Sequence, residues 1–122
     1  MSPFEKVKEF HKAFGQPVGE SPQFLTDDRI ALRRTLIEEE YEEFLQAIYD
    51  GDLVNAAKEV TDLLYVVYGT AVEMGIDIDS VFDEVHSSNM SKLDENGKAI
   101  FRDDGKVLKS DRYRPADVAS VM

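Results

Sequence analysis

The segment between residues 52 and 74 places the strongest constraint on how this chain folds. It reads "LVNAAKEVTDLLYVVYGTAVEM" after Asp52, which can cap a helix, and before Gly75, which can end one. Apolar residues cover nearly the whole circumference of this helix, as they do in helices that are buried on all sides. We therefore expect it to lie at the centre of a domain or of a dimer.

Three further helices are predicted, because apolar residues recur every three or four positions in three other segments. From Asp94 onward the pattern changes, and the turn dipeptides Asn-Gly and Asp-Gly indicate an irregular tail that can contain a small hairpin. A last turn of helix is expected after Pro115. The predicted fold is a single all-α domain over residues 1–122, a four-helix bundle with a basic C-terminal arm. The predicted helices span residues 3–14, 27–50, 52–74 and 79–92, and the tail spans residues 93–122.

The chain has 122 residues, which suits one domain but leaves too little structure to surround the central helix completely. We therefore expect a homo-oligomer, either a dimer or a dimer of dimers. No apolar run approaches the roughly 20 residues that a membrane span needs. The amino-terminal segment lacks the pattern of a secretory signal, and the chain has no cysteine, so a cytoplasmic location is expected.

The chain carries 25 acidic and 14 basic residues, a net charge of −11 that disfavours binding to nucleic acids. The charge is uneven along the chain. Residues 1–91 hold 7 basic and 19 acidic residues, whereas residues 92–122 hold 7 basic and 6 acidic residues. Half of the cations therefore lie in the last quarter of the chain.

Two pairs of carboxylates interrupt apolar helix faces. On a helical wheel of residues 27–50, Glu40 and Glu43 lie about 60° apart within the apolar stripe, and Glu59 and Asp62 repeat this arrangement on the central helix. Burying unpaired carboxylates is costly, so a cation is expected between them. Because only oxygen ligands are offered, a hard divalent ion, Mg²⁺ or Mn²⁺, fits this pattern.

A glutamate-rich helix is more often a solvated surface, and this alternative interpretation stays open for the segment "LIEEEYEEFLQAI". Glu38 and Glu42 fall on the opposite side of the wheel, where surface charge is expected. Glu39 lies at the border of the apolar stripe, about 100° from Glu40. Only part of this acidic run is therefore predicted to face the protein interior.

The same residues resemble a known superfamily. "EEYEE" at 39–43 and "EVTD" at 59–62 are similar to the EExxE…ExxD pattern of the all-α nucleoside triphosphate pyrophosphatases, the superfamily of MazG and the dimeric dUTPases. The resemblance continues to about residue 118 and looks closest to a small single-domain bacterial and phage branch of MazG-like enzymes. Thr61 departs from the pattern, since many relatives carry glycine or alanine there.

This resemblance implies Mg²⁺-dependent hydrolysis of a (deoxy)nucleoside triphosphate, with dUTP among the candidates, to the monophosphate and pyrophosphate. The implied biological role is house-cleaning of the nucleotide pool. Carried over to this sequence, the pattern makes Glu40, Glu43, Glu59 and Asp62 the metal ligands. It gives Glu39 the role of a further ligand or of the catalytic base.

A triphosphate carries about four negative charges, so cations outside the acidic cluster are expected to help hold it. Arg33 lies on the glutamate face of its helix, and Asn89 with Lys92 is similar to the NxxK of the superfamily. For Arg33 the alternative is pairing with the acidic cluster, for Asn89 it is a helix-end role, and for the lysines and arginines of the C-terminal region it is a surface role. The residues predicted to bind substrate are Arg33, Asn89, Lys92, Lys106, Lys109, Arg112 and Tyr113. The rival hypothesis is a non-catalytic helical oligomer whose acidic cluster binds only a metal or a partner.

Overall fold

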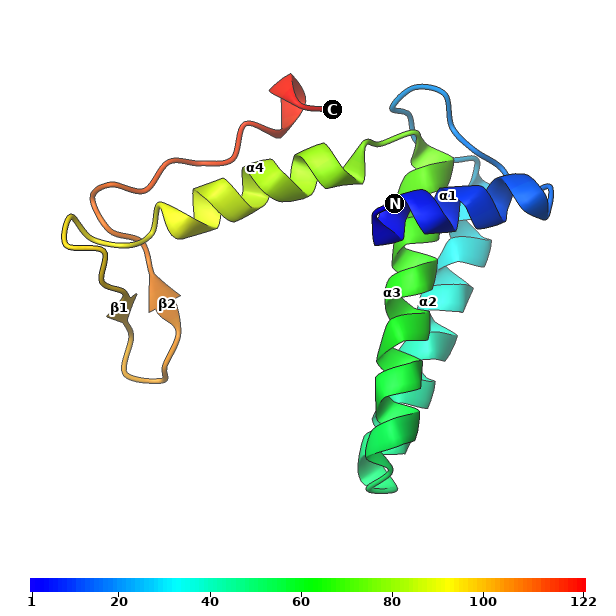
Figure 1. Ribbon diagram of the computed structural model, residues 1–122, viewed down its shortest axis with the longest axis horizontal. Helices are drawn as coiled ribbons and strands as arrows, with labels where there is room; N and C mark the ends of the chain where they lie inside the picture. Colours follow the sequence, from blue (N-terminus) through cyan, green and yellow to red (C-terminus); the bar gives the residue numbers. More distant parts are fainter. The chain divides into compact units, whose positions relative to one another are not determined.

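Four α-helices provide most of the regular structure of the chain, and the expected all-α fold is confirmed (Figure 1). The computed structural model describes all residues from 1 to 122, and contacts within the chain divide it into two compact units, Met1–Ile76 and Asp77–Met122. The expectation of a single domain over the whole chain stays a prediction. No helix is both long and apolar enough to cross a membrane. The helices are α1 (Pro3–Ala13), α2 (Asp27–Tyr49), α3 (Leu53–Met74) and α4 (Ile78–Met90).

In the first unit, α2 and α3 lie side by side and α1 packs on α3 (Figure 1). A short turn joins α2 to α3, and Asp52 caps α3 by accepting a hydrogen bond of 3.0 Å from the backbone N–H of Asn55. Gly75 ends α3 in the left-handed conformation with φ of 68°, which glycine adopts without strain. The capping and terminating residues predicted for α3 are therefore confirmed.

The core of the first unit is small. Its buried apolar residues are Phe4 and Val7 of α1, Ala47 of α2, and Ala71 and Val72 of α3. Helix α3 also exposes large apolar side chains elsewhere on its surface, including Leu64, which is 52% exposed. Within one chain α3 is thus buried only in part.

The second unit contains α4, a two-stranded antiparallel sheet and a single turn of 3₁₀ helix, Val118–Ser120. The strands are β1 (Ile100–Phe101) and β2 (Val107–Leu108), with Ile100 opposite Leu108. Both the hairpin and the helical turn after Pro115 were expected from the sequence. Helix α4 ends at Met90, two residues before the predicted end, where the Ser91 hydroxyl donates to the Ser88 carbonyl oxygen at 2.6 Å.

Candidate functional site

Three carboxylates from two helices converge in the first unit. Glu40 and Glu43 of α2 lie opposite Glu59 of α3, and one carboxylate oxygen of each lies within 4.8 Å of the others. Spacings of three residues place Glu40 with Glu43, and Glu59 with Asp62, one helical turn apart. Because α2 and α3 pack against each other, three of the four predicted metal ligands converge, and Asp62 is not among these three.

The cluster leaves buried oxygen atoms without partners. Glu59 is only 8% exposed, and neither its Oε2 atom nor that of Glu40 has a hydrogen-bond partner. Burial raises the pKa of Glu40, and the negative charge and hydrogen bond of Glu43, followed by the charges of Asp62 and Glu59, raise it further. Buried carboxylate oxygens that repel one another and lack donors are a suitable site for a cation.

Asp62 lies at the edge of this cluster and is paired with a lysine that was not singled out from the sequence. Lys58 Nζ lies 2.7 Å from Oδ2 of Asp62 and 3.4 Å from Oε1 of Glu59. These acids raise the pKa of Lys58, chiefly through the hydrogen bond with Asp62. The i, i+4 spacing of Lys58 and Asp62 is a sequence signal that could have identified the pair.

Glu43 is exposed although it belongs to the cluster, so the inward position predicted for it is wrong, and the other glutamates of the acidic run are also on the surface. Glu38 is exposed and pairs with Arg34 at 2.8 Å, as expected for a solvated helix face. Glu42 is also exposed. Glu39 is exposed and its side chain makes no hydrogen bond or ion pair within the chain, so its carboxylate is available to a ligand.

Arg33 is placed by the structure in a second buried polar group. Its side chain is 7% exposed, and the guanidinium donates to Oε2 of Glu73 at 3.0 Å, to the carbonyl oxygen of Val66 at 2.7 Å and to Oγ1 of Thr70 at 3.1 Å. Burial lowers the pKa of Arg33, and the charge of Glu73 opposes this effect. The predicted contact of Arg33 with substrate stays a prediction.

Glu73 is the buried acid that sequence reasoning missed. It lies 14 residues after Glu59, about 40° from it on the helical wheel, so the wheel contained a signal for its inward position. Arg29 also donates to Glu73, from Nε at 2.9 Å and from Nη2 at 2.8 Å. The arginines on the glutamate face of α2 thus pair with Glu73 and not with the three-carboxylate cluster.

The remaining predicted substrate contacts lie in the second unit. Asn89 is exposed near the end of α4, Lys92 is half-buried just after it, and Lys106 is exposed before β2. Lys109 and Tyr113 form a cation–π pair, with Nζ of the lysine 4.6 Å from the centre of the ring. Arg112 is exposed, and its guanidinium makes no hydrogen bond or ion pair within the chain.

Comparison with known proteins supplies two similarities. A family described as phosphoribosyl-ATP pyrophosphohydrolase matches residues 7–89, a range that includes the four predicted metal ligands and leaves out the C-terminal arm. The chain is also 29% identical over 111 residues to the uncharacterized protein L479 of Acanthamoeba polyphaga mimivirus. That similarity covers 88% of this chain and 42% of the viral protein, so the chain spans less than half of the relative's length.

Proposed function

Because the chain belongs to the phosphoribosyl-ATP pyrophosphohydrolase family, which shares the MazG-like all-α fold, we propose that it is a nucleotide pyrophosphohydrolase acting on a phosphoanhydride bond. In this reaction a nucleoside triphosphate gives the monophosphate and pyrophosphate. The observation that carries the proposal is the convergence of Glu40, Glu43 and Glu59, with buried oxygens of Glu40 and Glu59 left without donors.

The carboxylate set fits a hard divalent cation, since it offers only oxygen atoms and has unpartnered buried ones. Glu40, Glu43, Glu59 and Asp62 would hold Mg²⁺, with Mn²⁺ able to substitute. Such an ion, when bound, polarises phosphate oxygens and lowers the pKa of a coordinated water.

Glu39 is proposed either as a further metal ligand or as the base that takes a proton from the attacking water. Its carboxylate is exposed and unpaired, and it lies next in sequence to Glu40. A carboxylate that forms no ion pair within the chain can accept a hydrogen bond from a water molecule and orient it. The two roles are separable, because loss of a base lowers kcat without weakening metal binding.

The substrate-binding set is proposed to be the cations and polar groups predicted from the sequence. Exposed Lys106, Lys109 and Arg112 supply positive charge outside the acidic cluster. Arg33 is the least accessible member, because its N–H groups are directed to Glu73, Thr70 and Val66. The full set is Arg33, Asn89, Lys92, Lys106, Lys109, Arg112 and Tyr113.

Two substrate classes are supported by different observations. The motif spacing resembles that of enzymes that use deoxynucleoside triphosphates, including dUTP, in house-cleaning of the cytoplasmic nucleotide pool. The family description instead names phosphoribosyl-ATP, which is also a triphosphate and also yields pyrophosphate on hydrolysis. The small single-domain MazG-like branch is the assignment that we favour from the motifs.

We also propose that the active form is a homo-oligomer, a dimer or a dimer of dimers. Leu53, Val60, Leu64 and Val67 of α3 are large apolar side chains that remain exposed within one chain. Covering them with a second copy would remove apolar surface from water at about 25 cal/mol per Å². Nucleic acids and membranes are not among the proposed partners.

The activity is tested by incubating the full chain and Mg²⁺ with each dNTP, dUTP, each NTP and phosphoribosyl-ATP, followed by ion chromatography of the products. Release of pyrophosphate with the monophosphate, or with phosphoribosyl-AMP from phosphoribosyl-ATP, supports the proposal, and the rates identify the substrate class. Glu59→Gln is expected to abolish turnover, whereas Glu42→Gln, an equal change of charge on the exposed face, is expected to retain it.

Two results would contradict the activity. Release of orthophosphate alone would indicate a different phosphatase. Absence of turnover with every nucleotide, while Mn²⁺ still binds in an assay by electron paramagnetic resonance, would favour the rival hypothesis of a non-catalytic metal-binding helical oligomer.

A further inference from the structure

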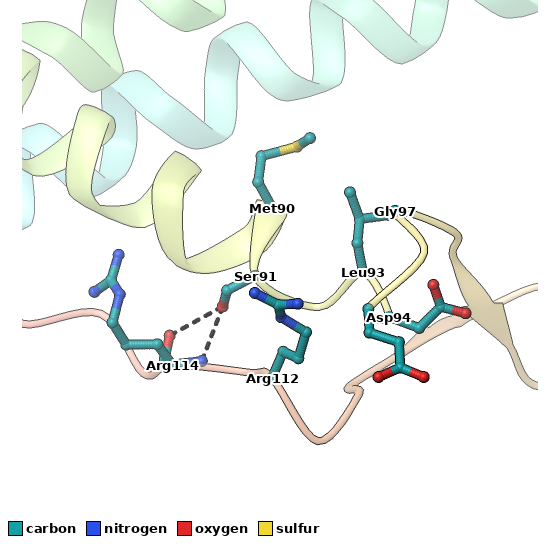
Figure 2. A pocket seen from close by; sticks show the side chains of 8 residues that line it. Met90, Ser91, Leu93, Asp94, Gly97, Arg112 and Arg114 are labelled. Carbon is teal, nitrogen blue, oxygen red and sulfur yellow. Dashed lines mark hydrogen bonds between the residues drawn. The ribbon is translucent and has the colours of Figure 1, made fainter.

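A pocket of about 470 Å³ lies at the carboxyl end of α4, formed entirely within the unit Asp77–Met122 (Figure 2). Met90 and Leu93 provide its apolar wall, Asp94 and Glu95 provide carboxylates, and Arg112 enters from the C-terminal arm. The cavity is large enough for a heterocyclic base and a sugar.

Several polar side chains that line the pocket have donor or acceptor atoms without a hydrogen-bond partner in the chain. The guanidinium of Arg112 and the carboxylate of Glu95 make no hydrogen bond or ion pair within the chain. Oδ1 of Asp94 accepts from the backbone N–H groups of Asn96 and Lys98, each at 2.9 Å, and no bond involves its Oδ2 atom. The pocket thus offers both donors and acceptors to a ligand.

The charges of the residues that line the pocket indicate whether it suits the triphosphate or the uncharged nucleoside part of the substrate. Arg112 contributes one positive charge and Asp94 with Glu95 contributes two negative charges, while the other lining arginine, Arg114, is already paired with Glu84. A triphosphate with about four negative charges would be repelled by these carboxylates. A neutral group with its own donors and acceptors would be accepted.

We propose that this pocket binds the nucleoside part of the substrate, the base with its sugar, and that Arg112 contacts it directly. A planar guanidinium can stack on a base and donate to its carbonyl groups. Carboxylates accept hydrogen bonds from sugar hydroxyls or exocyclic amines. The proposal rests on the proposed nucleotide hydrolysis, and it assigns Arg112 to the nucleoside and not to the phosphates.

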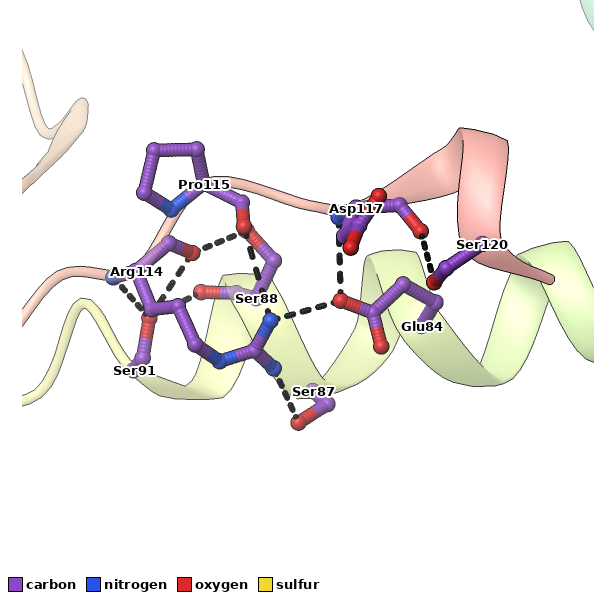
Figure 3. Close-up of polar contacts among 8 residues, drawn as sticks. All are labelled: Glu84, Ser87, Ser88, Ser91, Arg114, Pro115, Asp117 and Ser120. Carbon is purple, nitrogen blue, oxygen red and sulfur yellow. Dashed lines mark hydrogen bonds and ion pairs between the residues drawn. The ribbon is translucent and has the colours of Figure 1, made fainter.

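Arg114 holds the arm that carries Arg112 against α4 (Figure 3). Its Nη1 donates to Oε1 of Glu84 at 2.6 Å and its Nη2 donates to Oγ of Ser87 at 2.7 Å. Its backbone is fixed as well, because the buried Ser88 hydroxyl donates to its carbonyl oxygen at 2.8 Å and its N–H donates to Ser91 Oγ at 2.8 Å.

The arm is also fixed on the other side of Arg112. Ser110 Oγ donates to the carbonyl oxygen of Leu93 at 2.6 Å and accepts from the backbone N–H of Arg112 at 3.1 Å. Arg112 therefore lies between two attachment points, at Ser110 and at Arg114. Arg114 is a positioning residue, since it acts on the ligand through Arg112.

The nucleoside site is tested by NMR with the ¹⁵N-labelled full chain in EDTA, titrated separately with nucleosides and with inorganic tripolyphosphate. The nucleosides are adenosine, guanosine, cytidine, uridine, thymidine and 2′-deoxyuridine. At least one of these nucleosides is expected to shift the backbone amide resonances of Leu93–Gly97 and Arg112–Arg114. Tripolyphosphate is expected to leave these resonances unchanged. Shifts of these amides by tripolyphosphate alone, or by no probe, would overturn the proposal.

Variants of Arg112 then separate a ligand contact from a general loss of charge. Arg112→Ala should abolish the nucleoside-induced shifts and raise KM for the preferred nucleotide at least about fivefold, with kcat within about twofold. Arg102→Ala is the matched control, because Arg102 is an exposed arginine of the hairpin region paired with Asp104 and outside the pocket. Equal effects of both variants would mean that Arg112 acts only through net charge.

The positioning role of Arg114 is tested by comparing Arg114→Ala with Arg114→Lys. The alanine variant should raise KM as Arg112→Ala does, and the lysine variant should recover part of this loss because it can still pair with Glu84. A purely structural role would instead lower the melting temperature in both variants and leave KM of the folded protein unchanged.

Failure of the nucleoside site is distinguishable from failure of the proposed activity. If no nucleotide is hydrolysed but nucleosides shift the pocket amides in an Arg112-dependent way, the activity is wrong and the site stands. If pyrophosphate is released with the same KM in Arg112→Ala as in the unmodified chain, the activity stands and the site is wrong.

Discussion

Arg33 of α2 and Glu73 of α3 form a buried ion pair, with 3.0 Å between Nη1 and Oε2 and with the Glu73 side chain fully buried. Arg29, one helical turn before Arg33, donates to the same carboxylate. This group fastens the beginning of α2 to the end of α3, whereas the carboxylates Glu40 and Glu59 meet farther along the same helix pair. One interface therefore holds a group of two arginines and one buried glutamate and, farther along, a separate excess of negative charge.

Replacing Glu73 should destabilise the protein strongly, because Arg33 would remain buried without its counter-charge. We expect Glu73→Ala to lower the free energy of unfolding by about 3–5 kcal/mol, measured by urea denaturation followed by circular dichroism. The control is Glu38→Ala, which removes the exposed pair with Arg34 and should cost no more than about 1 kcal/mol. Similar losses in the two variants would show that burial adds nothing to the Glu73 interaction.

Neutralising a predicted metal ligand should not destabilise the metal-free protein. Glu40→Gln and Glu59→Gln each remove a repelling charge from a cluster with unpartnered buried oxygens. In EDTA we expect the free energy of unfolding to stay unchanged or to rise by up to about 1–2 kcal/mol. With Mg²⁺ both variants should lose turnover. Glu42→Gln is the control, and a marked loss of metal-free stability in both cluster variants would indicate a structural role.

The attachment of the C-terminal arm to α4 should weaken in acid. The backbone N–H of Asp117, and then the guanidinium of Arg114, hold the pKa of Glu84 below its ordinary value. The stabilisation from this depressed pKa is complete above the ordinary titration range of glutamate, near pH 4.3, and is lost as the pH falls through the lowered pKa.

This pH dependence can be followed through the amide resonance of Asp117 between pH 6 and pH 3. In the unmodified chain we expect protection of this amide from hydrogen exchange to decrease toward the acid end of the range. Glu84→Gln, which cannot titrate, should show a smaller change with pH. If both proteins change in parallel, titration of Glu84 does not control the attachment.

A charged residue on the exposed apolar surface of α3 should dissociate the proposed oligomer. Leu64→Arg places a positive charge where an apolar side chain is now 52% exposed, and an unpaired charge in an interface is costly. Light scattering during gel filtration should give the mass of a dimer or larger assembly for the unmodified chain and of a monomer for the variant. Glu42→Arg is the control. A monomeric unmodified chain would refute the oligomer.

The helices and turns could be predicted from the sequence because their signals are local. Asp52 and Gly75 delimit α3 through their own backbone preferences, and the Asp-Gly turn predicts the hairpin without reference to the rest of the chain. The inward position of Glu40 and Glu59 was also accessible, since helix periodicity alone places them among apolar residues. What a helix presents on each face is a property of its sequence.

Which faces meet, and which charges pair across them, was decided only by the tertiary structure. Glu73 accepts hydrogen bonds from Arg29 and Arg33 because of the register between α2 and α3. Glu84 accepts one from Arg114 because the C-terminal arm runs back along α4. Such pairs join residues 30 to 44 positions apart. Their geometry follows from the summed packing of whole elements, so the sequence of either partner alone does not contain it.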